Sequence, residues 1–228
     1  MTPKKKKSSI FDMQTLIVLT LVLFVGLGVY AIFQSVGQTG ETDAPPLTGV
    51  DPSAHPTIGQ ASAPVKLVEF GDFKCPACKM FHDSIWPVIK KEYIDTGKAQ
   101  MTFVNFQFIG PDSITAGMAG EAVYRQNPDA FWKFYEAVYA NQGEESKQWA
   151  TPEFLTDLIR KHVPEVDADK VAQDLAAKTH EKDVLDDNRL AQKNQIDGVP
   201  AVYVNGKKVN GLDLNELKAA IEKELNGK

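Results

Sequence analysis

The pattern of apolar and polar residues divides the chain into three parts. An uncharged apolar run of 18 residues extends from Leu16 to Phe33 and follows four consecutive lysines at positions 4–7. As a helix this run would be about 27 Å long, which nearly matches the hydrocarbon core of a bilayer. Residues 36–60 are rich in Gly, Pro, Thr, Asp and Ser, and this composition predicts a flexible linker. Regular strand and helix periodicity follows from residue 61 onward.

The apolar run predicts a transmembrane helix, so that residues 1–35 form a basic cytoplasmic stub and a membrane anchor. The run is longer than the roughly 7–15 apolar residues of a signal peptide. The small residues Ser35-Val36-Gly37 keep a cleaved signal as the alternative. A buried core helix is disfavoured because a lysine run and a polar linker flank the segment. The lysines hold the N-terminus in the cytoplasm, so both membrane hypotheses place the rest of the chain in an extracytoplasmic, oxidising space.

Strand and helix patterns alternate at the two ends of the remaining chain. Strand patterns lie at Val65–Phe70, Met101–Phe108 and 201–209, the last interrupted by an Asn-Gly pair that is typical of a hairpin turn. Helical patterns lie at 75–95 and Leu214–Leu225. Pro87 should kink the first of these helices because proline lacks an N–H donor.

The middle of the chain is helical throughout. Helical spacing covers Ser113–Gln126, Asp129–Asn141, a segment that starts at Thr151-Pro152, and two stretches within 167–195. The second helix carries a row of large apolar residues, for which core packing is the simplest interpretation: Phe131, Trp132, Phe134, Tyr135, Val138 and Tyr139. This order of elements predicts an α/β core, formed by residues 61–110 and 196–228, that is interrupted by an all-helical insertion at 111–195.

Composition and charge exclude several classes of protein. The chain of 228 residues is 43% hydrophobic and 24% charged, which is ordinary for a folded protein with a core. Residues 1–35 hold four lysines and one aspartate, so the acidic excess behind the net charge of −5 lies in the remainder. That remainder lacks the basic cluster that nucleic-acid binding requires. Two cysteines are too few for a disulfide-stapled scaffold.

Both cysteines stand in a C-P-A-C motif between the first predicted strand and the first predicted helix. Cys75 falls at the helix N-terminus, where free N–H groups and the helix dipole stabilise a thiolate and lower its pKa. Cys78 lies one turn further along and is suited to resolve a mixed disulfide. Because the thiolate is the reactive species in exchange, the motif predicts a thiol–disulfide exchange site.

Three other interpretations of the cysteines fit less well. A structural disulfide across so short a loop would constrain the unfolded chain little. A structural zinc site needs four ligands, and Cys75, Cys78 and His82 supply at most three. Two inert buried thiols are unusual in an oxidising compartment. We expect His82 and Lys74 to be exposed to solvent.

Three motifs in this order resemble the DsbA-like thiol–disulfide oxidoreductases, in particular their membrane-anchored Gram-positive BdbD type. They are G-x-x-x-A-P-V ahead of V-E-F, then C-P-A-C, then G-V-P-A-V-Y-V-N-G. The resemblance covers the chain from Gly59 to the C-terminus. It implies a thioredoxin fold interrupted by a helical domain, in agreement with the periodicity, and an enzyme that introduces disulfide bonds into exported proteins.

The resemblance also implies roles for individual residues. Cys75 would be the nucleophile and Cys78 the resolving cysteine of a redox-active disulfide. Pro200 matches the family's cis position, where the backbone of Val199 would pair with substrate, although a proline that merely starts a strand is the alternative. Glu69 matches a partly buried carboxylate that accepts the proton of Cys78, and an exposed strand-edge glutamate is the alternative.

Ala77 departs from the strong oxidants of the family, which often have histidine there. Alanine offers the thiolate neither charge nor hydrogen bond, so the direction of electron flow stays open. In some relatives of the Gram-positive type, a structural calcium lies away from the cysteines, and Glu121 and Asp187 match as oxygen ligands. A solvated acidic face formed by Asp183, Asp186 and Asp187 is the simpler interpretation. No organic cofactor is expected.

The implied substrates are exported proteins with free thiols, and the implied partner is a DsbB-like, quinone-linked membrane oxidoreductase that restores the disulfide. The expected location is the bacterial cell membrane, with a single span and the catalytic domain on the extracytoplasmic face. A thioredoxin-like reductant or thiol-maturation protein with the same fold is the first alternative. A binding or chaperone module without catalysis is the second, and the variant Cys75→Ser separates it from both redox functions.

Overall fold

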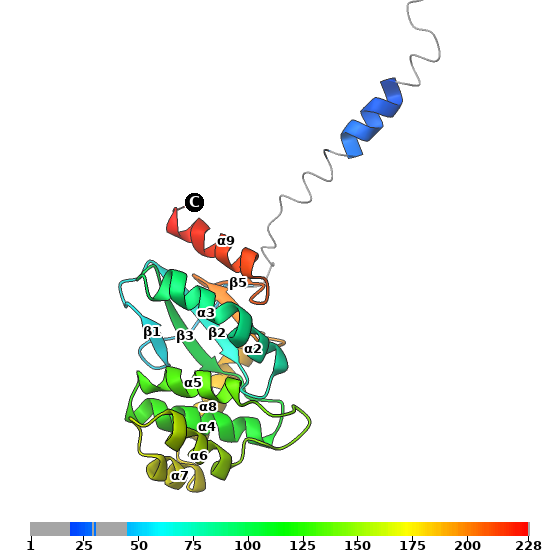
Figure 1. Ribbon diagram of the computed structural model, residues 1–228. Helices are drawn as coiled ribbons and strands as arrows, with labels where there is room; N and C mark the ends of the chain where they lie inside the picture. The colour runs from blue at the N-terminus through cyan, green and yellow to red at the C-terminus, as the bar shows by residue number, and fades with distance from the viewer. Residues whose placement is uncertain (1–18, 29, 31–44, 228) are drawn as a thin grey trace, which may run out of the picture. The chain divides into compact units, whose positions relative to one another are not determined.

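The computed structural model describes residues 19–28, 30 and 45–227. The chain divides into two compact units, Met1–Thr39 and Gly40–Lys228 (Figure 1).

In the first unit, residues 19–28 and residue 30 are helical and exposed. Within the described residues, none of the helices combines the length and the apolar content that crossing a bilayer requires. The rest of the expected anchor, at positions 16–18, 29 and 31–33, lies outside the described residues.

A mixed five-stranded sheet forms the centre of the second unit (Figure 1). The strands are β1 (Thr57–Gly59), β2 (Val65–Gly71), β3 (Ala99–Asn105), β4 (Ala201–Val204) and β5 (Lys207–Val209). Their order is β1-β3-β2-β4-β5, with β2 and β3 parallel and the other pairs antiparallel. The central strand β2 is buried on both faces, which explains why its sequence is apolar almost throughout.

One helical run after β2 matches the predicted helix. It consists of α2 (Pro76–Met80), η1 (Phe81–Ile85), α3 (Trp86–Ile89) and η2 (Lys90–Ile94). The segments η1 and η2 are π-helical. They flank Pro87, so the helix departs from α geometry on both sides of the residue where the sequence predicts a kink.

The two faces of the sheet are covered by different parts of the chain. The run from α2 to η2 and the C-terminal helix α9 (Leu214–Leu225) contribute to one large hydrophobic core. Lys218 of α9 forms an ion pair of 2.6 Å with Glu92 of η2, which links these two helical segments. A smaller core on β2, β3 and β4 includes Ala191, Ile196 and, from the N-terminal side, Leu47.

The predicted helical insertion is present and lies at one end of the sheet (Figure 1). It consists of α4 (Pro111–Gln126), α5 (Ala130–Ala140), α6 (Pro152–His162), α7 (Ala168–Ala176) and α8 (Glu181–Lys193). Thr151 caps α6 as predicted, because its hydroxyl accepts a hydrogen bond from the N–H of Phe154 at 3.2 Å. The apolar residues predicted to pack in the core from α5 are all buried.

The N-terminal boundary of the fold differs from the sequence prediction. The sequence predicts a flexible linker over residues 36–60, but β1 lies within that range and pairs with β3. The N–H of Leu47 donates to the carbonyl of Gly206 at 2.9 Å. The second half of the expected linker is therefore part of the folded unit. It supplies hydrogen-bond partners to one edge of the sheet and covers one face of the sheet.

The end of β3 also differs. The predicted strand Met101–Phe108 stops at Asn105, because the backbone N–H groups from Gln107 onward donate to side-chain acceptors instead of to a neighbouring strand. Gln107 donates its N–H to Asn188 at 2.8 Å, and Phe108 donates to Asp72 at 2.8 Å. These long-range side-chain acceptors cannot be read from a local alternation of apolar residues.

Candidate active site

The two cysteines differ in their environments although they lie in one turn of helix. Cys75 immediately precedes α2 and is 8% exposed, whereas Cys78 within α2 is fully buried. The hydrogen bond from the Cys78 side chain lowers the pKa of Cys75 to about 7, against its burial, and the N–H groups of Cys78 and Ala77 contribute in the same direction. Burial raises the pKa of Cys78. Both thiols are free, and Cys75 is the one that ionises near neutral pH.

The loop before β4 faces Cys75 across the end of the sheet. The Val199–Pro200 peptide bond is cis, and the Sγ atom of Cys75 lies 3.5 Å from the carbonyl oxygen of Val199. These residues meet, despite a separation of 124 positions, because β2 and β4 are neighbours in the sheet.

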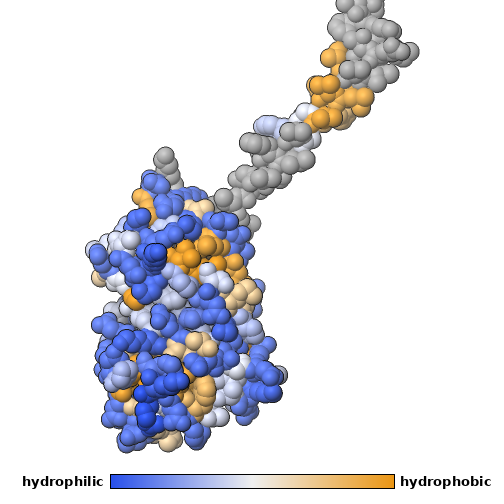
Figure 2. Space-filling model, viewed as in Figure 1, coloured by the Kyte–Doolittle hydropathy of each residue, from blue (hydrophilic) through white to orange (hydrophobic). Residues whose placement is uncertain are grey.

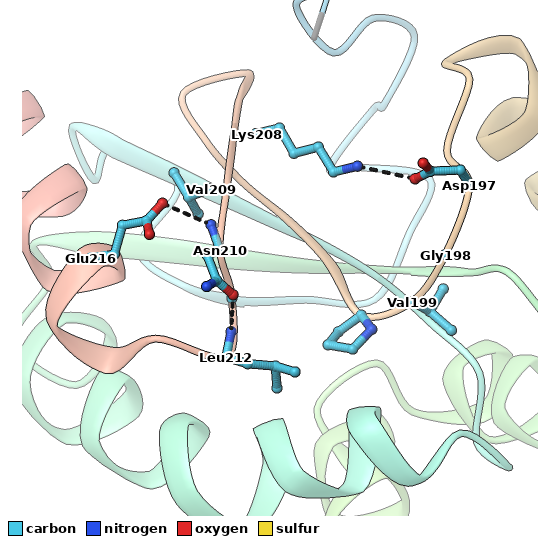
Figure 3. Close-up of a pocket in the computed structure, with 10 residues that line it drawn as sticks. Asp197, Gly198, Val199, Lys208, Val209, Asn210, Leu212 and Glu216 are labelled. Carbon is cyan, nitrogen blue, oxygen red and sulfur yellow. Dashed lines mark hydrogen bonds and ion pairs between the residues drawn. The ribbon is translucent and has the colours of Figure 1, made fainter. Parts of the chain in front are cut away.

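A pocket of about 460 Å³ opens beside this loop. Figure 3 shows Asp197 and Val199 on one side of it and the segment from Val209 to Leu212 on the other. Asp197 pairs with Lys208 at 3.2 Å at the rim. In Figure 2 a hydrophobic area lies over the region of α2 and β5, where the pocket is located. The surface beside Cys75 is therefore concave, apolar inside and charged at the rim.

Glu69 is fully buried in β2, with Phe103 and Val202 opposite it on the neighbouring strands. Burial raises the pKa of Glu69 to about 8. The hydroxyl of Tyr135 donates a hydrogen bond of 2.8 Å to Oε2 of Glu69, which acts in the opposite direction, and the charge of Cys75 adds to the rise. The alternative of an exposed strand-edge glutamate is therefore wrong.

Lys74 is not the exposed loop lysine that the sequence predicts. Its side chain is 3% exposed, and its ammonium group lies 2.7 Å from Oδ1 of Asp112 at the start of α4. The other carboxylate oxygen of Asp112 accepts hydrogen bonds from the N–H groups of Trp149 and Ala150. The residue next to Cys75 is thus fixed to the insertion by a buried ion pair.

His82 also differs from its prediction. Only 13% of its side chain is exposed, because the ring packs against the rings of Tyr135 and Tyr139. It does not lie free in solvent, and in the described part of the chain no group of three His, Cys, Asp or Glu side chains could hold a metal ion.

The sequence pattern predicts only core packing for α5. The polar contacts of this helix with the loop between β2 and α2 were not predicted. Tyr139 donates its hydroxyl to the carbonyl of Asp72 at 3.3 Å. Gln142, just after α5, donates its amide to the carbonyls of Phe73 and Cys75 at 2.9 and 3.0 Å. The one available signal was the presence of tyrosine, rather than phenylalanine, at buried positions of this helix.

Glu121 and Asp187, the two candidate calcium ligands, do come together. The side-chain nitrogen of Asn105 donates to both carboxylates, at 2.9 and 3.1 Å. His55 contacts Asp187 at 3.1 Å, and Arg125 lies 3.8 Å from Glu121. Burial, followed by the charge of Asp187, raises the pKa of Glu121 to about 7. The exposed acidic face that the sequence predicts on α8 is confirmed for Asp186, which pairs with a surface lysine and a surface arginine. Asp187 is buried instead.

A thioredoxin-type sheet that carries a C-x-x-C pair at the start of its first helix, together with a helical insertion, defines the class of DsbA-like thiol–disulfide oxidoreductases. A family model described as thioredoxin matches residues 52–223.

Similarity to known proteins identifies the family within this class. The chain is 44% identical over 173 residues to the probable disulfide bond formation protein D of Bacillus cereus, covering 76% of this chain and 80% of the relative. It is 41% identical over 175 residues to disulfide bond formation protein D of Bacillus subtilis, covering 76% and 78%. The crystal structure of oxidised BdbD from Bacillus subtilis superposes with a TM-score of 0.77 at 38% identity, covering 82% of this chain and all of that one. The chain belongs to the disulfide bond formation protein D (BdbD) family.

Proposed function

We propose that this thiol–disulfide oxidoreductase donates the Cys75–Cys78 disulfide to exported proteins. The observation that carries the proposal is the asymmetry of the pair. Cys75 is at the surface end, ionises near neutral pH and faces the carbonyl of Val199 beside an open pocket. Cys78 is buried and keeps its proton. A disulfide between them presents one sulfur to an incoming thiolate and shields the other.

The exchange follows from these positions. A substrate thiolate attacks Sγ of Cys75, the Cys75–Cys78 bond breaks, and its electron pair leaves on Cys78. The buried Cys78 thiolate then takes a proton from the Glu69 carboxyl, whose pKa of about 8 keeps it largely protonated at neutral pH. A second substrate thiolate attacks the substrate sulfur of the mixed disulfide and releases Cys75 as a thiolate. The protein gains two electrons and the substrate gains one disulfide.

The loop at Val199 and Pro200 is the proposed docking site for the substrate chain. An extended substrate segment beside Val199 would bring the substrate cysteine to Cys75. The substrate side chains next to that cysteine would enter the pocket that Val199 and Leu212 line. The apolar interior suits the hydrophobic segments that an unfolded exported protein still exposes.

Membrane attachment through the run Leu16–Phe33 and reoxidation by a DsbB-like, quinone-linked membrane oxidoreductase complete the proposal. The basic flank and the length of the apolar run support the anchor. The need for an oxidant supports the partner, because each cycle leaves Cys75 and Cys78 reduced. The expected location is the extracytoplasmic face of the bacterial cell membrane.

The redox potential of the Cys75–Cys78 pair tests the direction of electron flow. Equilibration in a glutathione redox series should give a value near or above about −120 mV, as for a disulfide donor whose reduced form is stabilised. A value near about −270 mV would instead identify a thioredoxin-like reductant or thiol-maturation protein. Two observations favour that second candidate, namely Ala77 in the motif and a Cys75 pKa only about two units below its ordinary 9.0.

The variant Cys75→Ser tests whether the chain acts through exchange at all. We expect this variant to lose oxidation of a reduced, unfolded substrate completely, since Cys78 alone is buried and cannot form the disulfide that would be donated. Retention of cellular function by the variant would leave a binding or chaperone module as the remaining explanation.

A structural calcium at Glu121 and Asp187 stays a proposal. The two buried carboxylates supply the oxygen ligands that calcium prefers. The groups facing them here are nitrogen donors, from Asn105, His55 and Arg125, so a cation would have to displace at least one of these groups. A rise in melting temperature with calcium, reversed by a chelator, is expected if the ion binds. An unchanged melting temperature would count against it.

A further inference from the structure

We propose that Tyr135 of the helical insertion is a positioning residue for thiol exchange, because its hydroxyl orients the Glu69 carboxyl group and stabilises its ionised form. The inference rests on the proposed role of Glu69 as the proton partner of Cys78. Through Tyr135, the helical insertion would take part in the chemistry of the cysteines.

The contact between the two side chains is direct and completely buried. The hydroxyl of Tyr135 lies 2.8 Å from Oε2 of Glu69, and the two residues are 66 positions apart in the sequence. Both side chains are withdrawn from solvent. Oε1 of Glu69 has no hydrogen-bond partner among the described residues. One oxygen of the carboxyl group is thus held by tyrosine, and the other remains available to exchange a proton.

As far as the structure describes the chain, the surroundings of Glu69 contain no compensating cation. In the described residues, no ion pair includes Glu69. Its partners on the neighbouring strands are Phe103 and Val202. The titratable groups that act on it or are influenced by it are Cys75 and Cys78 from the motif and Tyr135 and Tyr139 from α5. None of these groups carries positive charge, so the tyrosine hydroxyl is the main stabiliser of the carboxylate.

The position of the Tyr135 hydroxyl is fixed by the packing of its ring. Among the described residues, six aromatic rings from three parts of the fold surround it: His82, Trp86, Phe103, Phe131, Trp132 and Tyr139. Burial raises the pKa of Tyr135, so its hydroxyl stays protonated and remains a donor. A rigid donor that keeps its proton stabilises the ionised carboxylate of Glu69 more than the protonated carboxyl group.

This hydrogen bond matters when Cys78 must lose its proton. To resolve a mixed disulfide on Cys75, the Cys78 thiol transfers its proton to ionised Glu69, and the resulting thiolate attacks Sγ of Cys75. The Cys75–substrate bond then breaks, and its electron pair leaves on the substrate sulfur, which departs as a thiolate. Without the hydroxyl of Tyr135, Glu69 would be ionised in a smaller fraction of molecules at neutral pH, and this step would slow.

The decisive experiment measures the ionisation of Glu69 directly. The carboxyl carbon of Glu69 is followed by ¹³C NMR through a pH titration of the full chain, and Glu69→Gln assigns the signal. We expect Tyr135→Phe to move the titration midpoint upward by about one pH unit, the effect of losing one hydrogen bond to a charged group. The rate at which Cys78 releases glutathione from a Cys75–glutathione disulfide should fall about tenfold at neutral pH.

Tyr139→Phe is the matched control. It removes another buried tyrosine hydroxyl from the next turn of α5, but that hydroxyl donates to the backbone carbonyl of Asp72. A Glu69 midpoint that is unchanged in Tyr135→Phe, or that moves equally in both variants, would overturn the proposal. If Tyr135→Phe does not fold, ¹³C-labelled tyrosine gives the same answer, because the Tyr135 signal should titrate with Glu69 and cease to do so in Glu69→Gln.

The titration also separates this proposal from the proposed function. If the chain exchanges no thiols but Tyr135→Phe still shifts the Glu69 midpoint, the proposed function fails while the pairing stands. If exchange is normal in the parent chain and neither the midpoint nor the release rate depends on Tyr135, the positioning role fails alone.

Discussion

The chemistry of the two cysteines is set by their places at the start of one helix. Cys75 is the last residue before α2, so the free N–H groups of Ala77 and Cys78 in the first turn help to lower its pKa. Cys78 lies inside the same turn and is shielded by the core. Three residues of separation therefore produce one thiol that ionises readily and one that resists ionisation.

Removing the Cys78 thiol should raise the pKa of Cys75. The hydrogen bond from Cys78 is the largest of the influences that lower this pKa to about 7. In Cys78→Ala we expect the thiolate absorbance of the reduced protein to titrate at a higher pH, closer to the ordinary value of 9.0. Met80→Ala, an exposed residue of the same helix, is the control. An unchanged midpoint in Cys78→Ala would show that the backbone alone stabilises the thiolate.

Glu69 should make the fold less stable as the pH rises. Its pKa is about 8 in the folded chain against an ordinary 4.5, so the folded state binds the proton more tightly. The free energy of unfolding therefore falls as the pH rises through this window. Glu69→Gln cannot ionise, so its stability relative to the parent should increase by about 5 kcal/mol as the pH rises from 4.5 to about 8.

Urea unfolding of the oxidised protein measures this difference without thiol ionisation. Glu144→Gln makes the same chemical change at a side chain that is 68% exposed and should show no such trend. Parallel pH profiles for the parent and Glu69→Gln would mean that Glu69 ionises in the folded chain as it does in water.

At the scale of elements, the loop between β2 and α2 is held by the insertion on several sides. The ion pair of Lys74 with Asp112 ties it to α4. Gln142 and Tyr139 tie its carbonyl groups to the end of α5. The geometry of the cysteine motif therefore depends on helices that are far away in the sequence.

Breaking the buried ion pair should cost much more than breaking an exposed one. Asp112→Ala leaves the ammonium of Lys74 buried without its partner and removes the acceptor of two backbone N–H groups. We expect a loss of about 3–5 kcal/mol in the free energy of unfolding. Glu144→Ala, which removes an exposed partner of Lys147, should cost about 0–1 kcal/mol. Equal losses in urea unfolding would contradict the structural importance of the pair.

At the scale of the whole molecule, the sheet and the insertion share one core. Phe103 of β3 lies against the rings of Phe131 and Tyr135 of α5. Trp86 of α3 stacks on Trp132 of α5, with ring centroids 5.2 Å apart. The insertion is thus joined to the thioredoxin-type part by aromatic packing and is not a separate domain on a hinge.

Residues 40–228 should therefore unfold in a single cooperative transition. We expect the urea transition followed by tryptophan fluorescence to coincide with the one followed by far-ultraviolet circular dichroism. Trp149→Phe limits the fluorescence to the stacked pair Trp86 and Trp132, which spans the boundary between the two parts. If the fluorescence transition came at a lower urea concentration than the circular dichroism transition, the insertion would detach first.

The local features of this protein can be read from neighbouring residues in its sequence. The C-P-A-C motif at a helix start, the Thr151-Pro152 start of α6 and the Asn-Gly turn each act through neighbouring residues. Asn205 and Gly206 do adopt the left-handed conformation, with φ of 46° and 82°. Periodicity located the helices and most strands because it records which face of each element is buried. β1 escaped prediction because three residues carry too little periodicity.

Which polar groups meet depends instead on how the strands and helices pack together. Glu69 with Tyr135, Lys74 with Asp112, and Cys75 with Val199 are separated by 66, 38 and 124 positions. Each of these side chains has an ordinary local interpretation, such as a core aromatic or a loop lysine. Their partners are chosen by strand order and by the docking of the insertion on the sheet. Burial then gives these contacts their strength, since a polar group without water depends on the few partners that the fold places beside it.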